Sequence, residues 1–259
     1  MSARLTVLGG SSAGVGTGQG CSGYLVEIDG TRLVLDLGPD TLLELRKHTD
    51  FRTLDAVVIS HLHLDHILDL FALRFALCYN PHRPPHPTPL WLPPGGLAML
   101  DNAAKLFAAP GELDTYFSAQ FDINEYDPKQ PLSIGAATLT FAPTVHYVPC
   151  WAIRLGGADG GDLLYTADTG PAAPLAEFGQ GAEVLIAEAT LLEPGPEPWE
   201  TRGHMTVGEA AELGKAIGVA TLVLTHIWEE LGLERAVAIA AGVYHGRLAR
   251  AHPGLTITW

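Results

Sequence analysis

The sequence is short of cysteine, of long apolar runs and of positive charge. Three cysteines are spread over 259 residues without a C-x-x-C pair, which argues against a disulfide framework and favours reduced thiols. No apolar stretch approaches the roughly 20 residues of a transmembrane helix. The start, MSARLTVLGG, lacks the cationic and apolar regions of a signal peptide. We therefore expect a cytoplasmic protein without a membrane partner.

Basic residues are the scarcest charged group. There are 15 Lys and Arg against 29 Asp and Glu, which gives a formal net charge of −14. Proteins that hold long nucleic acids usually neutralise phosphates with a basic surface, so extended nucleic acid is a weaker candidate partner than a small substrate. The chain is 47% hydrophobic and has no repeat or low-complexity linker. It can bury a substantial core, and we expect one domain over residues 1–259.

Short apolar runs separated by glycine- and proline-rich turns predict an α/β protein with mixed sheets covered by helices. A capping box at Thr206 and Glu209 predicts the start of one helix, and Gly218 its end. The proline-dense segment 80–95 predicts a surface loop that leads into a short edge strand. The predicted strands are 4–8, 24–28, 32–36, 55–59, 137–142, 150–155, 162–167, 183–188, 221–225 and the terminal LTITW, and the predicted helices are 41–48, 67–79, 207–217 and 233–243.

The stretch SHLHLDHILDL (60–70) crowds four titratable side chains into six positions directly after an apolar run. Imidazole nitrogens and carboxylate oxygens are the ligands that zinc takes from proteins. His61 and His63 can share one ion, while Asp65 and His66 turn toward a second. Two such ions, about 3.5–4 Å apart, need further ligands from elsewhere in the chain.

Three later side chains are candidates for those further ligands. His146, Asp168 and His226 each follow a predicted strand, and open α/β sheets place their sites at strand ends. Each residue alone is better explained as a polar residue in a loop. Together with the first cluster, they predict a dinuclear metal site at the edge of the sheets.

The H-x-H-x-D-H motif of residues 61–66 resembles the signature of the metallo-β-lactamase superfamily. The resemblance covers nearly the whole chain and implies an αββα four-layer sandwich with two zinc ions in a cleft, manganese being the alternative metal. It implies that His146 joins His61 and His63 at one ion and that His226 joins Asp65 and His66 at the other. Asp168 would bridge the two ions. Asp36 in LVLDLG matches an early aspartate that supports the metal loop as a hydrogen-bond acceptor; a plain turn residue is the alternative.

Two departures from other members' patterns indicate which subfamilies of the superfamily this sequence does not resemble. Redox members with two iron ions carry a glutamate at the position of His63, and secreted β-lactamases have a cysteine where Asp168 stands. By contrast, AEAT (187–190) and GHMT (203–206) resemble the HEAT and HST motifs of ribonuclease Z and related phosphodiesterases. Each motif differs from the family's at one position. Ala187 replaces the first histidine of HEAT, and Met205 replaces the serine of HST.

That second resemblance implies that Glu188 orients His204, which then assists the leaving oxygen. The alternative is a buried Glu188 in an ion pair and a His204 that only precedes a helix cap. We also expect Asp65 to hydrogen-bond the attacking nucleophile. The catalytic candidates are therefore Asp65, Glu188 and His204.

Two features argue against a tRNA-sized substrate, in addition to the acidic charge. The glycine-rich stretch 11–23 contains no Lys or Arg, and the segment between His146 and Asp168 has room only for a hairpin. No G-x-G-x-x-G in that stretch precedes a helical pattern, because residues 23–28 are predicted to form a strand. A dinucleotide-binding fold is therefore not expected, and we predict a flexible turn that lines the cleft.

A small phosphodiester such as a cyclic nucleotide or cyclic phosphate fits best. The alternatives are a tRNA 3′-processing endonuclease, a thioester or lactone hydrolase, and a carrier without catalysis. The resemblance also implies a homodimer, a state that ribonuclease Z relatives often adopt.

Overall fold

Two sheets lie face to face in the computed structural model of this chain, which describes residues 3–157 and 161–259. The first sheet has the strand order β14-β1-β2-β3-β4-β5-β6, and the second has the order β13-β12-β11-β10-β9-β8-β7. The strands of the first sheet are β1 (Arg4–Gly9), β2 (Gly23–Ile28), β3 (Thr31–Leu37), β4 (Ala56–Val58), β5 (Thr88–Leu92), β6 (Phe121–Glu125) and β14 (Thr256–Thr258). Those of the second are β7 (Leu132–Ile134), β8 (Ala137–Pro143), β9 (Trp151–Gly156), β10 (Asp162–Tyr165), β11 (Ala182–Glu188), β12 (Thr221–Thr225) and β13 (Arg247–Arg250).

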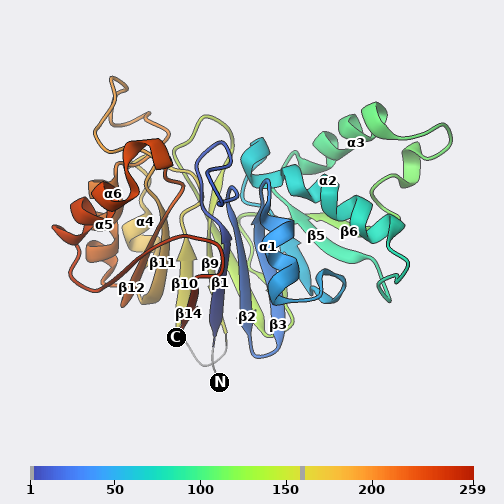
Figure 1. Ribbon diagram of the computed structural model, residues 1–259, viewed down its shortest axis with the longest axis horizontal. Helices are drawn as coiled ribbons and strands as arrows, with labels where there is room; N and C mark the ends of the chain where they lie inside the picture. The colour runs from blue at the N-terminus through green and yellow to red at the C-terminus, as the bar shows by residue number, and fades with distance from the viewer. Residues whose placement is uncertain (1–2, 158–160) are drawn as a thin grey trace.

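Helices cover the outer face of each sheet (Figure 1). The helices on the first sheet are α1 (Thr41–His48), α2 (Leu64–Tyr79) and α3 (Gly96–Phe107), and those on the second are α4 (Leu175–Phe178), α5 (Val207–Ile217) and α6 (Leu233–Ala241). Three 3₁₀ turns complete the described elements: η1 (Phe51–Thr53), η2 (Leu113–Thr115) and η3 (Glu229–Leu231). The layers run helix, sheet, sheet, helix, so the predicted αββα sandwich is confirmed.

The apolar core fills the three spaces between these four layers. One cluster lies between the sheets, a second between the first sheet and its helices, and a third between the second sheet and its helices. Central strands such as β4 and β12 are buried along their whole length, which is why they read as continuous apolar runs in the sequence. Tyr24 and Tyr165 meet between the sheets with ring centroids 4.9 Å apart.

Most predicted elements are present, and apart from the start of α2 their bounds shift by no more than two residues. The capping box is formed, because Thr206 accepts a hydrogen bond from the Glu209 amide and the Glu209 side chain accepts one from the Thr206 amide. Gly218 ends α5 in the left-handed region, with φ of 79°. None of the helices within 3–157 and 161–259 is long and apolar enough to cross a membrane.

Two predictions about the first sheet are wrong. Helix α2 begins at Leu64 rather than at residue 67, so Asp65 and His66 lie in its first turn, where the helix dipole favours a carboxylate. Strand β5 lies inside the segment 80–95 that is predicted as a loop. It is not an edge strand, because β6 pairs with it in parallel and forms the edge. The chain reaches β6 only after α3, so no local pattern joins the two strands.

Five elements were not predicted: α3, β6, β7, α4 and β13. These elements are short or lie at the periphery. Only Gly96, Leu100 and Ala104 are buried in α3, and no residue of β13 is fully buried. Their apolar periodicity is therefore too weak to stand out in the sequence.

Candidate metal centre

Loops from both sheets bring all seven predicted ligands together at one end of the sandwich. His61 and His63 follow β4, while Asp65 and His66 come from the first turn of α2. From the second sheet, His146 follows β8, Asp168 follows β10 and His226 follows β12. The parallel strands β3, β4, β10, β11 and β12 all point their carboxyl ends at this edge, which is the edge where open α/β sheets build sites.

The ligand atoms fall into two groups that share Asp168. The first group is His61, His63, His146 and Asp168, and the second is Asp65, His66, Asp168 and His226. Within each group the ligand atoms lie within 4.8 Å of one another. This is the same division that the sequence motif and its resemblance predict.

Several polar atoms in these groups are arranged for a cation rather than for each other. The Nε2 atoms of His61 and His66 and Oδ1 of Asp168 are buried without a hydrogen-bond partner in the described part of the chain. Leaving such a group unsatisfied costs about 1–3 kcal/mol. His63 Nδ1 and His146 Nε2 face each other at 3.0 Å. A divalent cation in each group would satisfy these atoms, so the residues present fit metal binding.

Asp36 supports the second group through hydrogen bonds, as predicted. It is fully buried at the end of β3. Oδ2 of Asp36 accepts hydrogen bonds from His66 Nδ1, the Ser60 hydroxyl and the Tyr165 hydroxyl, each at 2.7 Å, and Oδ1 accepts one from the Ser60 amide, also at 2.7 Å. With Nδ1 of His66 bonded to Asp36, Nε2 of this ring is directed at the ligand group.

Other ligand rings are oriented in the same way. Nδ1 of His146 donates to the carbonyl oxygen of Gly203 at 2.9 Å, and Nδ1 of His226 lies 2.8 Å from the Thr190 hydroxyl. In both rings Nε2 is left to face the carboxylates of the cluster, since His226 Nε2 is 3.1 Å from Oδ2 of Asp65. Neither Thr190 nor the Gly203 carbonyl was predicted as part of the site, although Thr190 is the last residue of the AEAT stretch.

Burial and charge set the protonation of these rings. Burial, together with neighbouring rings such as His66, lowers the pKa of His61 well below 6.5, which keeps the neutral form that binds metals. Burial also opposes charge on His66, but Asp168 and Asp36 outweigh it and raise the pKa of His66 well above 6.5. The carboxylates around His66 therefore favour a positive charge at this position. Either a proton or a bound cation can supply that charge.

Glu188 and His204 form a hydrogen-bonded pair beside the two groups. Glu188 is fully buried at the end of β11, and its Oε1 accepts from His204 Nδ1 at 2.9 Å. The His204 side chain is 19% exposed, and its ring lies 5.5 Å from that of His226 between centroids. Burial lowers the pKa of His204, but the hydrogen bond and the charge of Glu188 outweigh burial and raise this pKa above 6.5.

The glycine-rich stretch closes one side of the centre. Ala13 donates its amide to Oδ2 of Asp65 at 3.1 Å, and Thr17 donates its amide and its hydroxyl to Glu229, each at 2.9 Å. The stretch is thus tied both to a predicted ligand and to the turn that follows His226. It lines the site, as the sequence predicted.

A family model described as a β-lactamase superfamily domain matches residues 31–227, a range that contains every predicted ligand. The chain belongs to this superfamily. Its sandwich is the metallo-β-lactamase fold, because the crystal structure of the metallo-β-lactamase fold protein YhfI from Bacillus subtilis superimposes on it with a TM-score of 0.86. That match has 27% identity and covers 100% of both chains. Membership of the superfamily, together with the two ligand groups, supports a metal-dependent hydrolase.

Other members of the superfamily are similar over most of this chain. In sequence, the probable metallo-hydrolase YhfI is 32% identical over 227 residues, 86% of each protein. A ribonuclease Z from Mycobacterium bovis is 28% identical over 213 residues, which is 75% of this chain and 76% of that protein. The crystal structure of a diphosphatase from the PhnP family covers 100% of this chain and 98% of its own, with a TM-score of 0.76 and 21% identity, and shows a shared fold.

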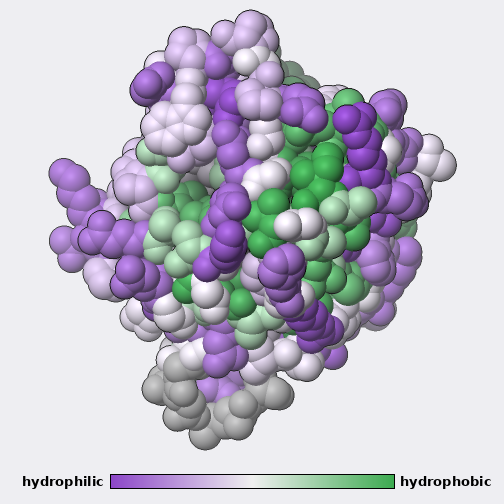
Figure 2. All heavy atoms as spheres, turned by 90° about the vertical axis from the view of Figure 1, so that its left-hand side faces the viewer, coloured by the Kyte–Doolittle hydropathy of each residue, from purple (hydrophilic) through white to green (hydrophobic). Residues whose placement is uncertain are grey.

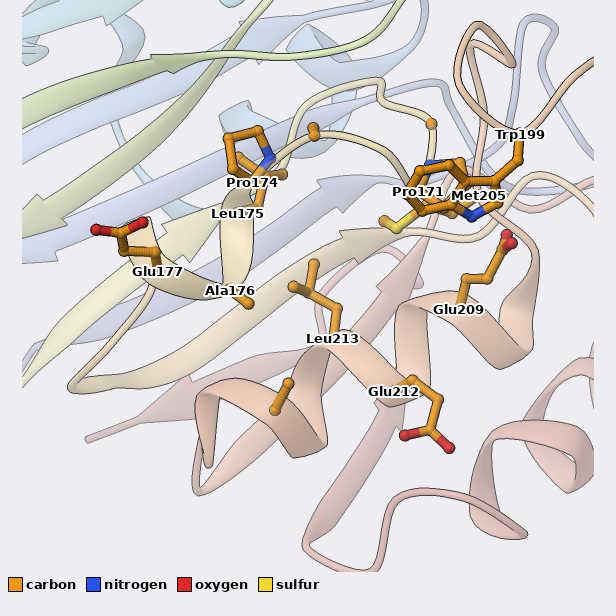
Figure 3. Close-up of a pocket in the computed structure, with 13 residues that line it drawn as sticks. Pro171, Pro174, Leu175, Ala176, Glu177, Trp199, Met205, Glu209, Glu212 and Leu213 are labelled. Carbon is orange, nitrogen blue, oxygen red and sulfur yellow. The ribbon is translucent and has the colours of Figure 1, made fainter.

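A groove of about 490 Å³ lies between α4 and α5, apart from the ligand groups. On the face that carries these helices, apolar side chains gather in the middle among hydrophilic ones (Figure 2). Figure 3 shows Trp199, Pro171 and Met205 together at one end of the groove, and Glu212 pointing away from it. The groove is lined by none of the seven predicted ligands. The groove is therefore separate from the candidate metal centre of this superfamily member.

Proposed function

We propose that the protein is a zinc-dependent phosphodiesterase of the cytoplasm that acts on a small diester, such as a cyclic nucleotide or a cyclic phosphate. The observation that carries this proposal is the 2.9 Å hydrogen bond between Glu188 and His204, next to two metal-ligand groups. Hydrolysis of a diester with a poor leaving group needs a proton donor at the departing oxygen. A hydrolase of activated esters has less need of such a pair.

The chain's residues divide the work as follows. His61, His63 and His146 would hold one ion and Asp65, His66 and His226 the other, with Asp168 in both groups. When bound, the two ions would supply activated water and neutralise charge on the phosphate oxygens. Asp65 would also accept a hydrogen bond from the attacking water.

His204 then serves the leaving group. Its Nδ1–H is held by Glu188, so Nε2 is the nitrogen that delivers a proton to the departing oxygen. The ring is partly exposed, and a substrate can therefore reach it. General acid catalysis of this kind contributes about 10²–10⁴-fold to the rate.

The size of the substrate is inferred from charge and from chain length. The net charge is −14, and stretch 11–23 contains no base. Between His146 and Asp168 the chain forms the antiparallel pair β9 and β10 rather than a long arm. These features favour a small diester over tRNA. The similarity to ribonuclease Z keeps a tRNA 3′-processing endonuclease as the second candidate.

The test compares two diesters in the metal-loaded protein: bis(p-nitrophenyl) phosphate, whose leaving group needs little protonation, and a 3′,5′-cyclic nucleotide, whose leaving alcohol does. We expect the parent to cleave both. His204→Ala with unchanged metal content should lose about 10²–10⁴-fold on the cyclic nucleotide and much less on the nitrophenyl ester. His252→Ala, which removes an exposed histidine near the C-terminus, is the matched control.

Three results would redirect the assignment. A fully metalated parent that cleaves neither diester would refute the phosphodiesterase, and thioesters and lactones would then be assayed. A His204→Ala variant that keeps the parent's rates on both diesters would refute the acid role. Cleavage of a precursor tRNA in preference to both small diesters would favour the endonuclease.

A further inference from the structure

Thr190 lies where the metal centre meets the Glu188–His204 pair. It follows β11 by two residues and is buried. Its hydroxyl oxygen is 2.8 Å from His226 Nδ1, 2.9 Å from Glu188 Oε2 and 3.2 Å from His204 Nδ1. One side chain thus contacts a predicted ligand and both members of the pair.

The protons in this contact can be assigned by counting. A threonine hydroxyl has one proton to donate, and an ionised carboxylate can only accept. The Thr190 hydroxyl therefore donates to Oε2 of Glu188. It then accepts from Nδ1–H of His226, which leaves the lone pair of Nε2 in that ring for a metal. His204 makes its shorter bond, 2.9 Å, to Oε1 of Glu188.

The result is a continuous chain of hydrogen bonds from His226 through Thr190 and Glu188 to His204. Glu188 is further held by two backbone amides, those of Thr169 and Thr190, each at 3.0 Å. The carboxylate is therefore fixed at both oxygens. The supports of the other ligand rings are different, since Asp36 holds His66 and a backbone carbonyl holds His146.

We propose that Thr190 is a positioning residue that couples the two halves of the site, fixing His226 for metal binding and Glu188 for orienting His204. The coupling to His204 rests on the phosphodiesterase function proposed above, whereas the effect on His226 does not. Loss of the hydroxyl should therefore weaken metal binding and, separately, the assistance given to a poor leaving group.

The first measurement is metal affinity, by competition with a chromophoric zinc chelator. Thr190→Val keeps the shape of the side chain and removes the hydroxyl, and loss of such an outer partner typically lowers affinity 10–100-fold. Thr190→Ser keeps the hydroxyl and should stay within a few-fold of the parent. Thr225→Val is the matched control, because it removes a buried hydroxyl bonded to Tyr24 at 2.6 Å, next to His226 but outside the chain of bonds. It should bind zinc like the parent.

The second measurement is the ratio of kcat/KM for bis(p-nitrophenyl) phosphate to that for a cyclic nucleotide, at saturating zinc. Thr190→Val should raise this ratio at least about tenfold, in the direction of His204→Ala, and Thr190→Ser should restore it. A ratio that stays at the parent's value in folded Thr190→Val, with the metal bound, would overturn the coupling. Parent-like zinc affinity in that variant would overturn the role at His226.

Two further results keep the test decisive. Thr190→Ala replaces Thr190→Val if the latter does not fold, and nitrogen-15 NMR of the zinc-loaded parent needs no variant. The proposed chain requires Nδ1 to be protonated in both His204 and His226, so an unprotonated Nδ1 in either ring would overturn it. A parent that cleaves neither diester refutes the proposed function and the coupling to His204, while zinc affinity still decides the role at His226.

Discussion

Replacing Asp36 by Asn tests how strongly the buried support of the metal centre controls metal binding. Asp36 has φ of 56°, a left-handed conformation that Asn tolerates, so the backbone should not be strained. The two side chains are also nearly the same size. The change therefore acts mainly through charge and hydrogen bonding.

The magnitude follows from the donors around Oδ2. Three groups donate to this oxygen, namely His66, Ser60 and Tyr165. An amide nitrogen in its place carries two protons, which the hydroxyls of Ser60 and Tyr165 can accept by rotating. The third group, Nδ1–H of His66, then faces an N–H and can no longer donate.

His66 can relieve that clash by moving its proton to Nε2, the atom that faces Asp168 at 3.3 Å. A proton there blocks the lone pair that a metal would use. We expect the affinity of the second ligand group to fall about 10–100-fold, which corresponds to about 1.4–2.8 kcal/mol.

The assay is chelator competition with zinc, with thermal unfolding as the check on folding. Asp69→Asn is the matched control. Asp69 lies on α2, about one turn after the ligands Asp65 and His66. It accepts a hydrogen bond from the Leu42 amide at 2.8 Å, a bond that Asn can keep. A folded Asp36→Asn variant with the parent's affinity would refute the reasoning about His66.

Three further predictions concern the acid pair, the start of α2 and the cap of α5. Activity on a cyclic nucleotide should fall as the pH rises through the raised pKa of His204, because the acid must be protonated; Glu188→Gln should move this fall to lower pH, and an unmoved pH–rate profile would contradict the pair. A Cβ at Gly38 would overlap the carbonyl oxygen of Asp65, so Gly38→Ala should lower both zinc affinity and melting temperature, and parent-like values of both would show that the helix start is not constrained. Thr206→Ala removes the side-chain cap of α5 and should lower the free energy of unfolding, measured in urea, by about 0.5–2 kcal/mol. Zinc affinity should not change.

Sequence reasoning succeeded where the information was local. Strand β12 is buried along its whole length and appears as an uninterrupted apolar run, and its end marks His226. The ligands at 61–66 stand close together in the chain, so their type and spacing were sufficient to predict two groups. The separate positions of His146 and Asp168 were predicted because each follows a recognisable strand.

The supports of the site could not be predicted in the same way. Tyr165 reaches Asp36 from a strand 129 residues away in the chain, and Thr190 reaches His226 across 36 residues. Neither has an unusual local setting, since a tyrosine in a strand and a threonine after one are ordinary. Their roles depend on how the two sheets are placed against each other, which no single stretch encodes.

The division of the ligands between the two sheets has a mechanical consequence. Each group takes two ligands from the first sheet's side, either His61 and His63 or Asp65 and His66, and the others from the second sheet. A bound ion would therefore link the two sheets, and metal affinity would depend on how the two sheets are positioned relative to each other. A substitution such as Leu163→Ala, in the apolar core between the two sheets, should therefore lower zinc affinity although Leu163 is not a ligand.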